Sequence, residues 1–144
     1  MLLQRVLTAL VLAPLAILII LLPPTAVFAA VVALAFLAAL WEWTQLSGLK
    51  SRAGRIALLI LAAGLFGLLW CARATALTPW LLAAGVAWWS LACLWLRHFT
   101  FGAAPTRENL ALKLLAGALV IFPAWVALVS IHGDRKSTRL NSSH

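Results

Sequence analysis

Residues 56–72 read IALLILAAGLFGLLWCA, an uncharged stretch enclosed by Arg55 and Arg73. Its length approaches the roughly 20 residues with which a helix crosses the hydrocarbon core of a bilayer. It lacks the two-residue alternation of a barrel strand, and only helices and closed barrels satisfy every backbone polar group inside a membrane. The stretch therefore predicts a transmembrane helix, in which Ala63 and Gly67 offer a face for close helix packing.

Four other apolar runs resemble this one. Together they predict an all-α fold, a polytopic transmembrane helix bundle of about five spans. The expected spans are residues 6–22, 25–41, 56–72, 77–96 and 112–131. Pro23-Pro24 separates the first two, and Thr78-Pro79 suits the start of the fourth because proline is tolerated in the first turn of a helix.

The composition supports a membrane protein. Of the 144 residues, 65% are hydrophobic and 10% are charged, and the mean hydropathy is +1.08. Soluble domains carry roughly a quarter charged residues. The net charge of +8 does not indicate a nucleic-acid partner, because the basic residues separate apolar runs and form no stripe on a polar face. The first run also fits a secretory signal with Arg5 as its basic region, but no exported soluble domain follows it.

The basic residues predict the orientation in the membrane. A cytoplasmic amino terminus leaves only Arg73 on the outer side of the five spans, and cytoplasmic loops are enriched in lysine and arginine. The residues then on the cytoplasmic side are Arg5, Lys50, Arg52, Arg55, Arg97, Arg107 and Lys113.

The composition changes abruptly at residue 134. Residues 134–144 are polar apart from Leu140, and they can be encoded by a widely used sequencing adapter translated in frame. We therefore expect an amino-terminal transmembrane region at 1–133 and a non-native polar tail at 134–144. The cluster His132-Gly133-Asp134-Arg135 resembles a small catalytic site, but half of it belongs to this tail, and we discount it.

Few residues are suited to catalysis. Outside the tail the only carboxylates are Glu42 and Glu108. They suit a metal site or acid–base chemistry, but equally an interfacial side chain and the first turn of a helix. His98 is expected at the membrane interface. No phosphate-binding loop, nucleophile elbow or metal cluster occurs, so we predict no catalytic, cofactor-binding or metal-binding residue.

Several segments resemble the amino-terminal half of bacterial phosphatidate cytidylyltransferases, also called CDP-diacylglycerol synthases. The most specific is the Trp-Glu-Trp segment within residues 40–48, LWEWTQLSG. The other matching segments are Met1–Pro14, Leu22-Pro23-Pro24, Trp88-Trp89 and Gly117–Trp125. Their order and spacing agree with that family over residues 1–133.

The resemblance implies an enzyme of the bacterial inner membrane that transfers a cytidylyl group from CTP to phosphatidate and requires Mg²⁺. The family's metal-binding and nucleotide-binding segments lie in the carboxyl-terminal half and are not found here. We therefore expect a truncated, inactive chain, in which Lys50, Arg52 and Arg55 contact the lipid headgroup. The resemblance also allows a homodimer. The alternative is a non-enzymatic membrane protein, either a small transporter subunit or an assembly factor, although nearly uncharged spans are unusual for a transporter.

Overall fold

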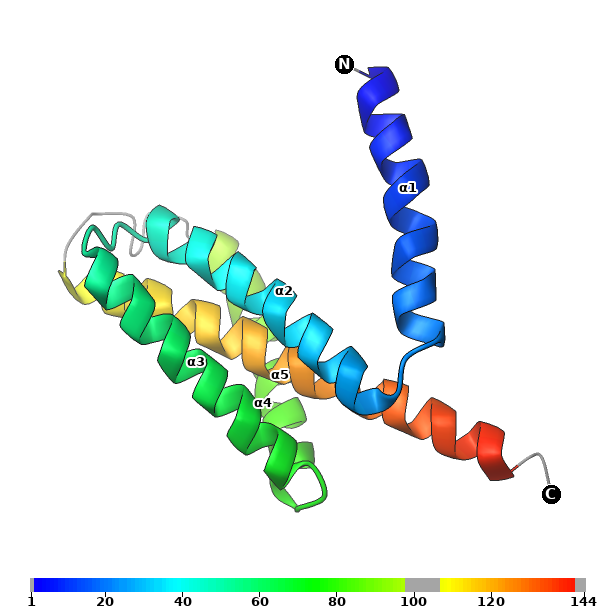
Figure 1. The fold of residues 1–144 in the computed structure, drawn as a ribbon. Coiled ribbons are helices and arrows are strands. Elements are labelled where there is room, and N and C mark those ends of the chain that lie inside the picture. The colour runs from blue at the N-terminus through cyan, green and yellow to red at the C-terminus, as the bar shows by residue number, and fades with distance from the viewer. Residues whose placement is uncertain (1, 98–106, 142–144) are drawn as a thin grey trace.

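The computed structural model describes the backbone of residues 2–97 and 107–141, and the side chains of residues 6–97, 109–135 and 137. Every regular element within these ranges is a helix (Figure 1), which confirms the predicted all-α fold. The helices are α1 Leu2–Leu21, α2 Thr25–Leu46, α3 Arg52–Ala72, α4 Leu77–Arg97 and α5 Arg107–Asn141.

Four of the helices are long and apolar enough to cross a membrane: α2, α3, α4 and the Asn109–Arg135 part of α5. This is compatible with a multi-pass membrane protein. The fifth expected span lies in α1. The part of α1 with described side chains, Val6–Leu21, is a shorter apolar helix. The α1 backbone does extend to Leu2.

Several observed helix ends lie beyond the expected spans. Helix α2 continues past residue 41 to Leu46, and α3 begins at Arg52 instead of residue 56. Helix α5 begins at Arg107 and continues past residue 133 to Asn141, where Ser137 Oγ donates to the carbonyl of Asp134 at 2.8 Å. No helix end marks the expected boundary of the polar tail, and its adapter origin stays a prediction.

Helices α2 to α5 form a bundle, and α1 projects away from it (Figure 1). Helix α5 packs against both α2 and α4, and α2 also packs against α3. Helices α2 and α5 run antiparallel. Trp43, near the carboxyl end of α2, contacts Lys113 near the start of α5, whereas Thr25, at the amino end of α2, contacts His132 further along α5. The α2–α3 turn therefore lies at the end of the bundle where α5 begins, which we call the basic end.

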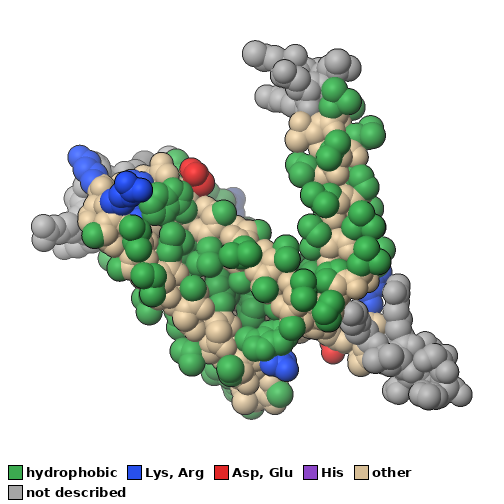
Figure 2. Space-filling model, in the orientation of Figure 1, with side chains coloured by type: hydrophobic (Ala, Val, Ile, Leu, Met, Phe, Trp, Pro, Cys, Tyr) green, Lys and Arg blue, Asp and Glu red, His purple; other side chains and the backbone are tan. Residues whose placement is uncertain are grey.

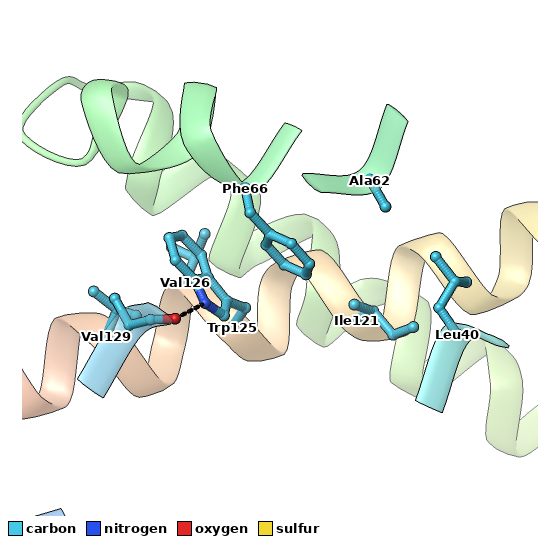
Figure 3. Close-up of a cluster of buried hydrophobic side chains, with 8 residues drawn as sticks. Leu40, Ala62, Phe66, Ile121, Trp125, Val126 and Val129 are labelled. Atoms are coloured by element: carbon cyan, nitrogen blue, oxygen red, sulfur yellow. Dashed lines mark hydrogen bonds between the residues drawn. The ribbon is translucent and has the colours of Figure 1, made fainter. Parts of the chain in front are cut away.

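The core lies where α2, α3 and α5 meet (Figure 3). Phe66 of α3 contacts the rings of Phe122 and Trp125 at centroid distances of 5.1 and 5.2 Å. Trp125 Nε1 donates a buried hydrogen bond of 3.0 Å to the carbonyl of Ala29 on α2. Because apolar burial drives helix association weakly in lipid, such close packing and interhelical hydrogen bonds hold the bundle together. The buried hydrophobic residues of this cluster are Ala29, Leu40, Ala62, Phe66, Ile121, Trp125, Val126 and Val129.

Two glycines allow helices to approach closely. A Cβ added at Gly117 would lie 2.5 Å from Trp43 Nε1, and one at Gly85 would lie 2.6 Å from Cβ of Pro123. The packing face predicted from Ala63 and Gly67 is wrong, since Ala63 is exposed and a Cβ at Gly67 would meet nothing within 4 Å. Helix α3 turns the neighbouring Ala62 and Phe66 inward instead.

Outside this core, apolar side chains cover most of the visible surface (Figure 2). Leu34, Ile60 and Val86 are each about two-thirds exposed, at 67%, 68% and 70%. Water would oppose so much exposed apolar surface, whereas lipid acyl chains solvate it. The exposed apolar surface is therefore compatible with a bilayer.

The two ends of α3 should face opposite sides of the membrane. Single cysteines placed near Arg52 and near Arg73, after replacement of Cys71 and Cys93, should be labelled from opposite sides by a membrane-impermeant thiol reagent. The positive-inside rule predicts that the Arg52 site faces the cytoplasm. Labelling of the Arg52 site in intact cells would contradict this orientation.

Candidate functional site

The α2–α3 turn holds the three residues predicted to contact a lipid headgroup, and its backbone is tightly defined. Helix α2 ends in a Schellman motif, in which Gly48 N–H donates to Gln45 O at 3.0 Å and Leu49 N–H donates to Thr44 O at 3.1 Å. Gly48 has a φ of +90°, a conformation that a Cβ would strain. The chain therefore reverses direction within a few residues of α2.

Helix α3 begins directly after this turn. The Ser51 hydroxyl caps the helix by accepting a hydrogen bond of 3.2 Å from the Gly54 amide. Lys50 and Arg52, on either side of Ser51, are both exposed. The turn and the cap thus present two cations at the surface.

Arg55 has a different environment from the other two predicted contacts. Its Nε donates to the carbonyl of Leu49 at 2.6 Å, and its guanidinium lies over the Trp41 ring, 5.6 Å from the centroid. The side chain is half-buried. Arg55 therefore holds the turn against α2, whereas the side chains of Lys50 and Arg52 are accessible to a ligand.

The Trp-Glu-Trp segment connects this turn to the rest of the bundle. Trp41 lies beneath Arg55, and Trp43 Nε1 donates to the carbonyl of Lys113 on α5 at 2.8 Å. Trp43 also covers Gly117, one turn along α5. Glu42, between the two tryptophans, is exposed. The two tryptophans thus hold the turn against α3 and α5.

Positive charge predominates at the basic end. Lys50 and Arg52 lie in the α2–α3 turn and at the start of α3, Arg55 lies in the first turn of α3, and Lys113 lies near the start of α5; Glu42 is the carboxylate near the same end of α2. Figure 2 shows lysine and arginine side chains gathered at this end of the bundle. A field of this sign attracts anionic headgroups and phosphorylated substrates.

The described residues do not fit the Mg²⁺ that the family resemblance implies. No group of three histidine, cysteine, aspartate or glutamate side chains among them lies close enough to hold a metal ion. Their two carboxylates are far apart, because Glu42 is near the basic end and Asp134 is near the other end of α5. The side chains of His98 and Glu108 lie outside the described residues.

His132 is a structural contact that the sequence reasoning missed. It is 4% exposed and stacks on Phe28 with a centroid distance of 4.2 Å and an interplanar angle of 8°. Its Nδ1 lies 3.3 Å from Thr25 Oγ1. His132 is buried, whereas Asp134 and Arg135 are exposed. His132 is therefore in a different environment from those two residues of the cluster that we discounted. The sequence carries one signal for this contact. His132 is a polar residue at the end of the last apolar run, and Thr25 is a hydroxyl residue at the start of the second.

Comparison with known proteins identifies the family. No solved structure matches the chain. The model of the cytidylyltransferase family matches residues 3–140, which includes both the Trp-Glu-Trp segment and the part of α5 that it contacts. The chain therefore belongs to the cytidylyltransferase family, which includes phosphatidate cytidylyltransferase.

Proposed function

We propose that this chain forms the lipid-binding part of an enzyme that makes CDP-diacylglycerol for phospholipid synthesis. Family membership supports a CTP-using nucleotidyltransferase in general. The observation that supports phosphatidate as the acceptor is the exposed pair Lys50 and Arg52, held at the end of membrane-crossing helices. A water-soluble acceptor would not require this placement.

In the proposed reaction a phosphate oxygen of phosphatidate attacks the α-phosphorus of CTP. A new P–O–P bond forms, the bond to the β-phosphate breaks, and pyrophosphate leaves. The acyl chains of phosphatidate anchor it among the apolar helices, so its phosphate lies in the headgroup layer. Lys50 and Arg52 would bind and orient that phosphate, with arginine offering a bidentate fork to two oxygens. The braced Arg55 would limit movement of the turn.

The proposal places the enzyme in the bacterial inner membrane with the basic end toward the cytoplasm. CTP is present on that side, and the positive-inside rule favours the same orientation. The Mg²⁺ and triphosphate sites would be formed by residues other than the described ones, because the described carboxylates do not cluster. Supplied with phosphatidate, Mg²⁺ and labelled CTP in detergent, this chain should form no labelled lipid above an empty-membrane control.

Phosphatidate binding tests the acceptor assignment. The double variant Lys50→Gln/Arg52→Gln should bind phosphatidate about tenfold more weakly than the unaltered chain, since each cation near an anionic surface contributes up to about 1 kcal/mol. Binding is measured as phosphatidate retained in nanodiscs of phosphatidylcholine, by mass spectrometry of the intact complex. Arg135→Gln, which removes an exposed cation elsewhere, should bind like the unaltered chain.

Two results would argue against the proposal. Equal retention of phosphatidate and phosphatidylcholine by the unaltered chain would show that the basic end does not select a phosphomonoester. Equal losses in the double variant and in Arg135→Gln would show that net charge alone governs binding. Either outcome would count against phosphatidate as the acceptor bound at this turn.

A further inference from the structure

A second cationic feature lies on the α3–α4 turn, at the far end of α3 from Lys50 and Arg52. The guanidinium of Arg73 lies over the Trp70 ring, 4.0 Å from its centroid, and Nη1 donates to the Trp70 carbonyl at 2.7 Å. At this distance the cation–π attraction is substantial. Arg73 is exposed, and Trp70 is half-buried.

The turn itself is held by hydroxyl groups. Thr75 Oγ1 donates to the carbonyl of Ala72 at 2.7 Å, and Thr78 Oγ1 donates to the carbonyl of Arg73 at 3.0 Å. The backbone on either side of Arg73 is thereby fixed. With one N–H and one ring face engaged, the guanidinium has a defined orientation and still carries further N–H donors.

The surroundings of this arginine are those of a membrane interface. Leu68 on α3 and Leu77 on α4 are 67% and 50% exposed, and Trp80 is 74% exposed. Tryptophan side chains favour the level of the lipid headgroups, with their rings against the acyl chains. A phospholipid lying along these helices would bring its phosphodiester to the level of Arg73.

We propose that Trp70 and Arg73 form a binding site for the phosphodiester of a bilayer phospholipid in the leaflet at this end of the bundle. The guanidinium matches two phosphate oxygens, the indole face holds the guanidinium in place, and the exposed leucines accept the acyl chains. This site is separate from the phosphatidate site and does not rest on the proposed function. It would fix the depth of the α3–α4 hairpin in the membrane.

Fluorine NMR on the full chain in detergent tests the site. All eight tryptophans are replaced by 5-fluorotryptophan, and Trp70→Phe assigns the Trp70 resonance. Titration with dihexanoylphosphatidylglycerol should shift this resonance, with binding about fivefold weaker in Arg73→Gln, as loss of one interfacial cation implies. Arg73→Lys, which keeps the charge but loses the fork, should bind with intermediate strength. Arg135→Gln should bind like the unaltered chain.

Three outcomes would overturn the inference. The first is equal binding by Arg73→Gln and the unaltered chain. The second is equal binding by Arg73→Lys, which would exclude a role for the guanidinium fork. The third is an equal shift with inorganic phosphate at the same concentration, which would assign the site to free phosphate. The seven other tryptophan resonances show whether each variant keeps the fold, and Arg73→Lys remains informative if Arg73→Gln does not.

Discussion

Gly117→Ala should lower the free energy of unfolding in detergent by about 1–3 kcal/mol, the usual cost of overpacking. The new Cβ would lie 2.5 Å from Trp43 Nε1 and 2.7 Å from Trp43 Cδ1. The indole must then move, and its 2.8 Å hydrogen bond to the Lys113 carbonyl is lost. Thermal unfolding of the purified chain, monitored by circular dichroism, measures the change.

A matched glycine provides the control. A Cβ at Gly67 meets nothing within 4 Å, so Gly67→Ala should leave stability unchanged or raise it by up to about 1 kcal/mol through helix propensity. A smaller side chain at Trp43 should relieve the clash, so Gly117→Ala should cost less in a Trp43→Leu background than alone. Equal effects of the two glycine substitutions would show that Trp43 does not pack on Gly117.

Trp125→Ala should be more damaging, with a loss of about 3 kcal/mol or more. Trp125 is 3% exposed, contacts Phe66 on α3 and donates to the Ala29 carbonyl on α2. Its removal leaves a cavity where three helices meet and breaks a buried interhelical hydrogen bond. The midpoint of thermal unfolding in the same detergent measures the loss.

Two further tryptophan substitutions complete the test. One separates ring packing from hydrogen bonding at Trp125, and the other provides an exposed tryptophan as a control. Trp125→Phe keeps most of the ring but not the Nε1–H donor, so it should lose about 1–2 kcal/mol. Trp89 is 55% exposed on α4, and Trp89→Ala should change stability by less than about 1 kcal/mol. A loss at Trp89 as large as that at Trp125 would mean that the core does not lie between α2, α3 and α5.

Long uncharged runs made the helices predictable from sequence alone. Each apolar run predicted a helix, because a bilayer leaves the backbone few other structures. The ends were less predictable. Helix α2 runs on to Leu46, where a Schellman motif ends it, and α3, capped by Ser51, begins four residues before the apolar run. These ends depend on local hydrogen bonds that hydrophobicity does not report.

The rotation of each helix about its own axis, which decides the face that points into the bundle, was also unpredictable. Ala63 and Gly67 look as suitable for packing as Ala62 and Phe66, since residues four apart share a face in either case. Contact with Phe122 and Trp125 on α5 selects the second pair. Likewise, Gly117 meets Trp43 across a sequence separation that no local pattern reveals.

The candidate site was predictable in outline. The cluster of Lys50, Arg52 and Arg55 was visible as charge between apolar runs, but the sequence could not show that their environments differ. In the structure Lys50 and Arg52 are exposed, whereas Arg55 is held by the Leu49 carbonyl and the Trp41 ring. Trp41 and Trp43 stood out by resemblance to a family, whereas their contacts with Arg55 and Lys113 required the fold.

Lipid turnover by the protein expressed from its own gene tests the proposed function most directly. The protein receives Mg²⁺, labelled CTP and either phosphatidate or diacylglycerol. We predict labelled CDP-diacylglycerol from phosphatidate alone, and a raised KM for phosphatidate with unchanged kcat in Lys50→Gln/Arg52→Gln. Absence of label transfer to phosphatidate would contradict the proposed reaction. An unchanged KM in the double variant would contradict the role of the α2–α3 turn.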